Sequence, residues 1–375
     1  MNNLLFKKWN DFSGWIVFLI AAFVYGMTIE PTASFWDCPE FISCAENLQV
    51  GHPPGAPFYM LVGNLFTQFA SEASQVSWLV NFLNALLSAG CILFLFWSIT
   101  RLVRSLIVNE EQNLSTIDVI VILGSGFVGA LAYTFSDTFW FSAVEGEVYA
   151  FSSFLTALVF WMILRWQDES DSVYGDRWII LIAYIIGLSI GVHLLNLLCI
   201  PAIVLVFYYQ KYHAISFKGV AAAIVISGLL IVFILFVYIP GIADMGGWFE
   251  LLFVNVFGLP FHTGLIVFLT LTFLVLVGAI YRFRKRMLHT SLCCLLMLTV
   301  GYTTYAVILI RANANTPLNE NAPDNIFTLK SYLNRAAISE EFLCFRHIRS
   351  LCRQRKAMPF RVNFPPDSGR TKKEA

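Results

Sequence analysis

The stretch "GVAAAIVISGLLIVFILFVY", residues 219–238, contains no charged side chain and decides the fold class. A helix of about 20 apolar residues is long enough to cross the hydrocarbon core of a bilayer. Comparable runs recur along the 375-residue chain, which is 58% hydrophobic and only 13% charged, with a mean hydropathy of +0.71. Soluble domains carry roughly 25% charged residues. The sequence therefore predicts an all-α polytopic membrane protein that works in the lipid bilayer and binds no nucleic acid.

About nine segments have the length and apolar character of membrane-spanning helices. They are residues 12–28, 78–99, 118–135, 148–165, 177–191, 193–209, 217–238, 264–281 and 290–311. Lys and Arg collect in cytoplasmic loops of membrane proteins, so their positions predict the orientation. With Lys7 and Lys8 inside, the Lys and Arg of the later loops also fall inside, and the opposite side has none in residues 29–77, 136–147 and 239–263. We therefore expect a cytoplasmic N-terminus.

The first outer loop, residues 29–77, is expected to contain two helices that lie in the membrane interface. The apolar segment "PFYMLVGNLFTQFA", residues 57–70, is too short for a comfortable crossing and suits an interfacial or re-entrant helix. A second helix is predicted to start at Pro39, because proline is favoured in the first turn of a helix. Phe41, Ala45 and Leu48 would then form its apolar stripe.

Two carboxylates flank Pro39, and two interpretations of them are open. Asp37 and Glu40 could cap the predicted helix, because free N–H groups and the positive helix end favour carboxylates there. Alternatively, Trp36 and Phe41 could place the acids against apolar surface, where partial desolvation raises the basicity of a carboxylate. A general base needs such an environment.

His52 shares this loop with the two acids and precedes Pro53-Pro54-Gly55, which restricts its backbone. We predict Asp37, Glu40 and His52 as the catalytic residues. The carboxylates of Glu46, Glu72 and Glu250 are expected to lie in solvated loops.

Further polar residues lie at the predicted outer ends of the spans. Glu145 and Glu147 precede the fourth span, and His193 lies near the outer end of its own span with Asn196 one turn later. An ionisable group at that depth is a functional candidate, although an imidazole bonded to Asn196 would also be satisfied. The predicted substrate-binding residues are Trp36, Glu145, Glu147, Tyr149, His193, Asn196 and Arg311.

Six stretches, in this order between residue 10 and about residue 335, carry a resemblance to a known family. They are "SFWDCPEFI", "GHPPGAPFYMLVGNLF", "VNFLNALLSA", "AVEGEVYAFSS", "GLSIGVHLLNLLCIPA" and "RANANTPLNENAPDN". In these stretches the chain resembles the protein O-mannosyltransferases and their GT-C-fold relatives. It resembles more closely a large bacterial membrane family that includes a eukaryotic O-mannosyltransferase.

The resemblance implies a GT-C-like domain over residues 1–311 in a bacterial inner membrane, with its active site on the extracytoplasmic face. It implies transfer of a mannose-like hexose from a polyprenyl-phosphate donor to a Ser or Thr hydroxyl of an acceptor protein, with inversion. Asp37 takes the position of the family's first-loop catalytic carboxylate. The departing phosphate needs positive charge or donors, which His52, His193 and Arg311 could supply.

The sequence shows no recognisable metal motif, and we assign no metal ligand and no cofactor. Asp37, Glu40 and Glu147 nevertheless carry the oxygen donors that a divalent cation would use.

Two rival functions remain open, a transporter or flippase and a non-catalytic membrane scaffold. A transporter would more often show ionisable groups at mid-membrane, whereas the acids here gather at one rim.

The C-terminal part divides into two segments. Residues 312–335 are expected to begin an outer soluble region. Residues 336–375 contain nine of the 24 Lys and Arg residues, which breaks the charge rule on the outer side. We expect a truncated or frameshifted end there, with a disordered terminus as the alternative.

Overall fold

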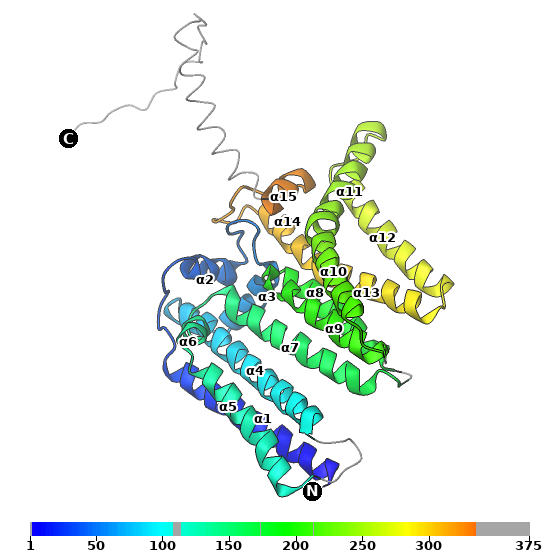
Figure 1. Ribbon diagram of the computed structural model, residues 1–375. Helices are drawn as coiled ribbons and strands as arrows, with labels where there is room; N and C mark the ends of the chain where they lie inside the picture. The colour runs from blue at the N-terminus through cyan, green and yellow to red at the C-terminus, as the bar shows by residue number, and fades with distance from the viewer. Residues whose placement is uncertain (1, 108–113, 173, 213, 335–375) are drawn as a thin grey trace, which may run out of the picture. The chain divides into compact units, whose positions relative to one another are not determined.

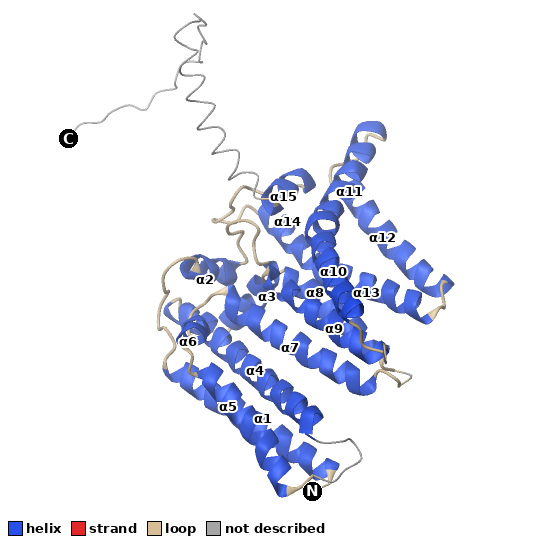
Figure 2. Cartoon of the chain, viewed as in Figure 1, coloured by secondary structure: helices blue, strands red, loops and turns tan. Residues whose placement is uncertain are grey.

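The computed structural model describes residues 2–107, 114–172, 174–212 and 214–334, so the predicted basic tail, residues 336–375, lies outside the described residues. The described residues form helices and no β-strand, apart from an isolated bridge between Val50 and Asn319 (Figure 2). The prediction of an all-α membrane protein is confirmed. In chain order the elements are α1 (Asn3–Met27), α2 (Cys38–Asn47), α3 (Pro57–Thr67), α4 (Ser74–Ile107), α5 (Thr116–Thr134), α6 (Asp137–Ala143), α7 (Val148–Glu169), α8 (Asp176–Ile190), η1 (Leu194–Cys199), α9 (Ile200–Lys211), α10 (Phe217–Phe233), η2 (Ile234–Tyr238), α11 (Ile239–Leu251), η3 (Leu252–Val256), α12 (Thr263–Arg282), α13 (Arg286–Tyr302), η4 (Thr303–Tyr305), α14 (Ala306–Asn313) and α15 (Ile326–Leu333).

Eight helical segments within the described ranges are long and apolar enough to cross a membrane, one fewer than the sequence predicted. They are Asn3–Met27, Ser74–Ile107, Thr116–Thr134, Val148–Glu169, Leu194–Lys211, Phe217–Val256, Thr263–Arg282 and Arg286–Asn313. The remaining predicted segment is α8, a 15-residue helix that extends about 22 Å, and the predicted orientation of the later loops requires it to cross as well. It ends at Gly191, whose N–H turns back to the carbonyl of Leu188, and the chain continues as the 3₁₀ helix η1.

The helix α4 is the centre of the N-terminal helices and packs against α1, α5 and α7 (Figure 1). Alanines and larger apolar side chains fill the contact, including Ala21 of α1, Ile92 and Phe96 of α4, and Ala130 of α5. Farther along the chain, α8 packs against α13. A Cβ on Gly187 would overlap the backbone carbonyl of Leu298, so glycine permits this close approach.

The two short helices predicted between the first two spans are present as α2 and α3. The helix α2 has 10 residues and α3 has 11, so neither can cross a bilayer. In the predicted stripe of α2, Phe41 and Ala45 are buried, but Leu48 lies just past the helix with a left-handed backbone (φ 48°). The helix therefore ends before the third position of the stripe.

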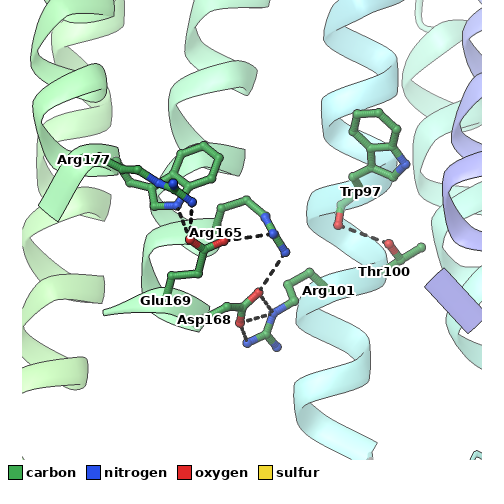
Figure 3. A network of polar contacts seen from close by, with 8 residues as sticks. Trp97, Thr100, Arg101, Arg165, Asp168, Glu169 and Arg177 are labelled. Carbon is green, nitrogen blue, oxygen red and sulfur yellow. Dashed lines mark hydrogen bonds and ion pairs between the residues drawn. The ribbon is translucent and has the colours of Figure 1, made fainter. Parts of the chain in front are cut away.

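The basic residues predicted to lie inside gather at the far end of the spans from the acidic loops. Figure 3 shows Arg101 paired with Asp168, while Arg165 contacts both Asp168 and Glu169, which also pairs with Arg177. On α4, Arg101 is 17 residues beyond Asn84, a separation of about 25 Å along the helix. Because Asn84 contacts the acidic loop before α7, the acidic and basic groups lie at opposite ends of these helices.

This separation leads to a topology prediction. Single cysteines placed near Glu46, Glu145 and Asp244 should react with a membrane-impermeant thiol reagent added from outside. Cysteines near Arg104 and Lys285 should react only after the membrane is opened. Labelling the Glu46 position solely from the inside would reverse the orientation.

Candidate functional site

The side chain of Asp37 does not cap the helix that it precedes. Asp37 is the N-cap residue of α2, yet its carboxylate makes no capping hydrogen bond, and 56% of the side chain is exposed. Trp36 has a left-handed backbone (φ 62°) and is 88% exposed. The interpretation of Asp37 as a side-chain cap is therefore wrong, and so is the expectation that Trp36 shields it.

His52 joins the two acids. Its Nδ1 lies 3.0 Å from each carboxylate oxygen of Glu40, and its backbone N–H donates to Glu40 Oε1 over 2.5 Å. Its Nε2 lies 3.8 Å from Asp37 Oδ2. The structure thus brings together the three side chains that the sequence predicted as catalytic.

The pKa of Glu40 shifts in the opposite direction to the one that the sequence predicted. The hydrogen bond to Glu40 is the main cause that raises the pKa of His52, although burial opposes it. Burial also works to raise the pKa of Glu40, but the hydrogen bonds from His52 outweigh it and lower that pKa. Glu40 is thus a weaker base than the sequence suggested, and His52 is favoured in its charged form.

Asp37, Glu40 and His52 each have a donor atom within 4.8 Å of the others, a spacing that could accommodate a cation. Both His52 nitrogens already face carboxylates, and these contacts account for the arrangement. We therefore assign no metal here.

Glu145 and Glu147 lie in the turn between α6 and α7, and both are buried, with 5% and 6% of their surface exposed. The amide nitrogen of Asn84 donates to the backbone carbonyls of both residues, over 2.8 Å to Glu147. The Asn84 carbonyl accepts from Tyr59. Asn84 thus fixes the turn that carries the two acids.

Asn84 was not among the residues predicted from the sequence, and neither was Asn81, whose amide nitrogen donates to the carbonyls of Glu30 and Thr32. Their spacing in the sequence could have identified them. Two asparagines three residues apart share one face of an otherwise apolar helix, and buried amides need partners.

Glu147 has the environment that the sequence assigned to the opening acids. Burial raises its pKa to about 7, and the neighbouring carboxylates of Glu145 and Asp37 add to the shift. The backbone N–H of Asp37 donates to the Glu147 carboxylate and partly opposes the shift. Burial also raises the pKa of Glu145, which accepts from the Ser34 hydroxyl.

Arg311 contacts the C-terminal end of α2. Its Nε donates to the carbonyl of Leu48 over 2.7 Å and its Nη2 to that of Asn47 over 2.9 Å. Arginine carries five N–H donors, so others remain for a ligand. The residue predicted as a phosphate anchor therefore also ties α14 to the segment between α1 and α4.

The segment after α14 packs on the loop that carries His52. Val50 and Leu318 form a backbone hydrogen bond of 3.1 Å, and the N–H of Glu320 donates to Val50 over 3.0 Å. The hydroxyl of Tyr332, a fully buried residue of α15, donates to the carbonyl of Gly51 over 2.7 Å. Residues 312–334 are thus integrated with the helical domain.

The remaining predicted binding residues form a second group. The rings of Tyr149 and His193 lie 5.4 Å apart, and His193 Nδ1 accepts from the N–H of Leu195. Asn196 is fully buried and accepts a hydrogen bond from Thr156, while its amide nitrogen has no partner among the described residues. Asn196 therefore does not donate to His193.

The expectation that Glu250 lies in a solvated loop is wrong, because only 1% of its surface is exposed. Its carboxylate accepts from the backbone N–H groups of His262 and Leu265 at the start of α12, the second over 2.9 Å. Glu250 therefore caps a helix and is not a solvated loop residue.

Comparison with known proteins connects this site to a family. Residues 37–216 match the family described as the protein O-mannosyl-transferase TMEM260 N-terminal domain. The protein O-mannosyl-transferase tmem260 of Dictyostelium discoideum is 24% identical over 148 residues, which cover 39% of this chain and 16% of the relative. The Mus musculus protein O-mannosyl-transferase TMEM260 is 25% identical over 174 residues, which cover 46% of this chain and 22% of the relative.

The matched segments thus span less than a quarter of either relative. No solved structure matches the chain. The matched part nevertheless contains Asp37, Glu40, His52 and the buried turn with Glu147. Residues 37–216 thus match the TMEM260 N-terminal domain family, and this part of the chain is similar to proteins named protein O-mannosyl-transferases.

Proposed function

We propose that this chain is a membrane protein O-glycosyltransferase. It moves a mannose-like hexose from a polyprenyl-phosphate donor to a protein Ser or Thr hydroxyl at the extracytoplasmic rim. The observation that carries this proposal is the exposed Asp37 carboxylate beside the Glu40–His52 pair, inside the segment that matches the family. The GT-C fold and the bacterial inner membrane remain predictions from the resemblance.

In this proposal Asp37 is the proton acceptor. A hydroxyl is a weak nucleophile until a carboxylate takes its proton in the transition state. The hydroxyl oxygen forms the new bond to the anomeric carbon on the side opposite the phosphate. The bond between the anomeric carbon and the phosphate oxygen breaks. The phosphate leaves with the electron pair, and the configuration at the anomeric carbon is inverted.

His52 and Arg311 are the cationic groups that this reaction can use. Glu40 favours the charged form of His52, whose Nε2 faces Asp37, so a positive charge stands next to the proton acceptor. Such fixed charge stabilises a departing phosphate. Arg311 lines a small pocket together with Glu40 and His52, and its free N–H donors would contact the phosphate.

Arg311→Lys should weaken use of the lipid donor despite the retained charge. A lysine cannot donate to the carbonyls of Asn47 and Leu48 and also to a phosphate with the geometry of the guanidinium fork. We expect the KM for the donor to rise several-fold, with Arg311→Gln more severe, in initial-rate measurements. An unchanged donor KM in Arg311→Gln would place the phosphate elsewhere.

The proposed function is tested with purified protein in lipid nanodiscs, a radiolabelled polyprenyl-phosphate mannose and a Ser/Thr-containing peptide. Labelled peptide that loses its sugar on treatment with an α-mannosidase or a β-mannosidase identifies both the product and the stereochemistry. Movement of the lipid between leaflets of a vesicle without labelled peptide would favour the flippase. Neither activity would favour the scaffold.

A further inference from the structure

The connection between α2 and α3 is held by residues that come much later in the chain, between α14 and α15 (Figure 1). Backbone carbonyls at the end of α2 and along this connection accept hydrogen bonds from them. These carbonyls belong to Asn47 and Leu48 (from Arg311), Val50 (from the N–H of Glu320), and Gly51 and His52 (from Tyr332). A shift of this backbone would leave several acceptors unpaired, which is costly. The segment that carries His52 is therefore fixed by the last described part of the chain.

Tyr332 makes the contacts that lie nearest to the imidazole. Its hydroxyl donates to the carbonyl of Gly51 over 2.7 Å and lies 3.2 Å from the carbonyl of His52. Only 1% of Tyr332 is exposed, so packing around the ring holds the hydroxyl in place. The hydroxyl thus fixes the backbone on both sides of the peptide bond that leads into His52.

Glycines on both sides of His52 permit this close packing. A Cβ on Gly51 would overlap Glu40 Oε1, and a Cβ on Gly55 would lie 2.7 Å from the Tyr332 hydroxyl. Gly55 also has a left-handed backbone (φ 70°), which glycine adopts without strain. The loop is therefore packed between the Glu40 carboxylate on α2 and the Tyr332 hydroxyl on α15.

The position of His52 decides whether its imidazole is charged. The ring lies 3.0 Å from Glu40 and 3.8 Å from Asp37. Glu320 adds negative charge from the segment after α14, and Arg311 lines the same pocket. The hydrogen bond to Glu40 is the main cause that raises the pKa of His52, and a hydrogen bond weakens steeply when its geometry is lost. A displaced His52 would therefore lose its proton more readily.

We propose that Tyr332 is a positioning residue for His52: its hydroxyl fixes the backbone of the loop so that the imidazole stays bonded to Glu40. This inference rests on the proposed function, in which the charged imidazole stabilises the departing phosphate. It extends the site to α15, which lies beyond residues 37–216, the part that matches the family.

The test compares Tyr332→Phe, which removes the hydroxyl and keeps the ring, with Tyr25→Phe. Tyr25 is the matched control, because it is also fully buried and its hydroxyl donates to a backbone carbonyl, that of Thr134 at the end of α5. We expect Tyr332→Phe to lower kcat about fivefold, the factor that corresponds to one lost hydrogen bond, with little change in the KM for the acceptor. The basic limb of its pH–rate profile should move to lower pH, because a less firmly held His52 loses its proton sooner. Tyr25→Phe should keep the parent kcat and profile.

A second readout does not depend on sugar transfer. Diethyl pyrocarbonate modifies the neutral imidazole, and 37% of the His52 side chain is exposed to the reagent. The extent of modification across a pH series, measured by mass spectrometry, gives the titration midpoint of His52. The midpoint should be lower in Tyr332→Phe than in the parent and unchanged in Tyr25→Phe.

Three results would overturn the inference. They are an unchanged midpoint in Tyr332→Phe, an equal loss of kcat in Tyr25→Phe, and a Tyr332→Phe variant that alone fails to fold, which would show that the hydroxyl stabilises the domain. If the parent chain transfers no sugar but the midpoint shifts as expected, the proposed function fails while the positioning of His52 by Tyr332 stands.

Discussion

Replacing Asp37 by asparagine is expected to reduce sugar transfer by a factor of about one hundred to ten thousand, the range found for loss of a general base. Asparagine has nearly the same shape but cannot accept the proton. Because the Asp37 side chain is largely exposed and makes no capping hydrogen bond, the fold should be unaffected. Initial rates with the lipid donor and peptide measure the loss, and thermal unfolding in detergent verifies the fold.

Glu40→Gln is the informative comparison for Asp37→Asn. Glu40 lies on the same helix, but its role is to bind the His52 ring and backbone. A glutamine retains an oxygen acceptor, so we expect a smaller, roughly tenfold loss that reflects the reduced charge on His52. Equal and mild losses in both variants would remove Asp37 from the role of base.

Asn84→Asp should have the largest effect on stability. The Asn84 amide nitrogen donates to the buried carbonyls of Glu145 and Glu147, and an aspartate cannot replace it. Each unsatisfied buried carbonyl costs about 1–3 kcal/mol, so the loss should reach about 2–6 kcal/mol. The new carboxylate would also lie beside two buried acids. We expect a strongly lowered unfolding temperature in detergent, or no folded protein.

Ser88→Ala is a suitable control for Asn84→Asp, because Ser88 is also fully buried on α4 and its hydroxyl has no partner among the described residues. It should change the unfolding temperature little. A folded Asn84→Asp variant with the parent's unfolding temperature would show that the turn is not anchored through this amide. A stable variant that transfers sugar normally would also separate the turn from the reaction.

The sequence alone determined the properties that depend on local composition. The apolar runs predicted the membrane helices, and the short segments starting at Pro39 and Pro57 predicted the two helices of the first outer loop. The placement of Lys and Arg predicted that charges would separate along the spans. These predictions succeed because the length of an apolar run and the charges at its ends act within one helix. The exception was α8, which has nearly the predicted bounds but, at 15 residues, is shorter than the other spans.

The tertiary structure decided which polar groups meet and which are buried. His52 binds Glu40 across 12 residues, Asn84 binds Glu145 across 61, and Arg311 binds Leu48 across 263. The sequence named most of these residues, but it gave the raised basicity to the acids at the start of α2. Packing of α2 and α4 against the turn before α7 instead buries Glu147 and leaves Asp37 exposed. Burial determines the cost of a charge, and burial depends on neighbours that are distant in sequence.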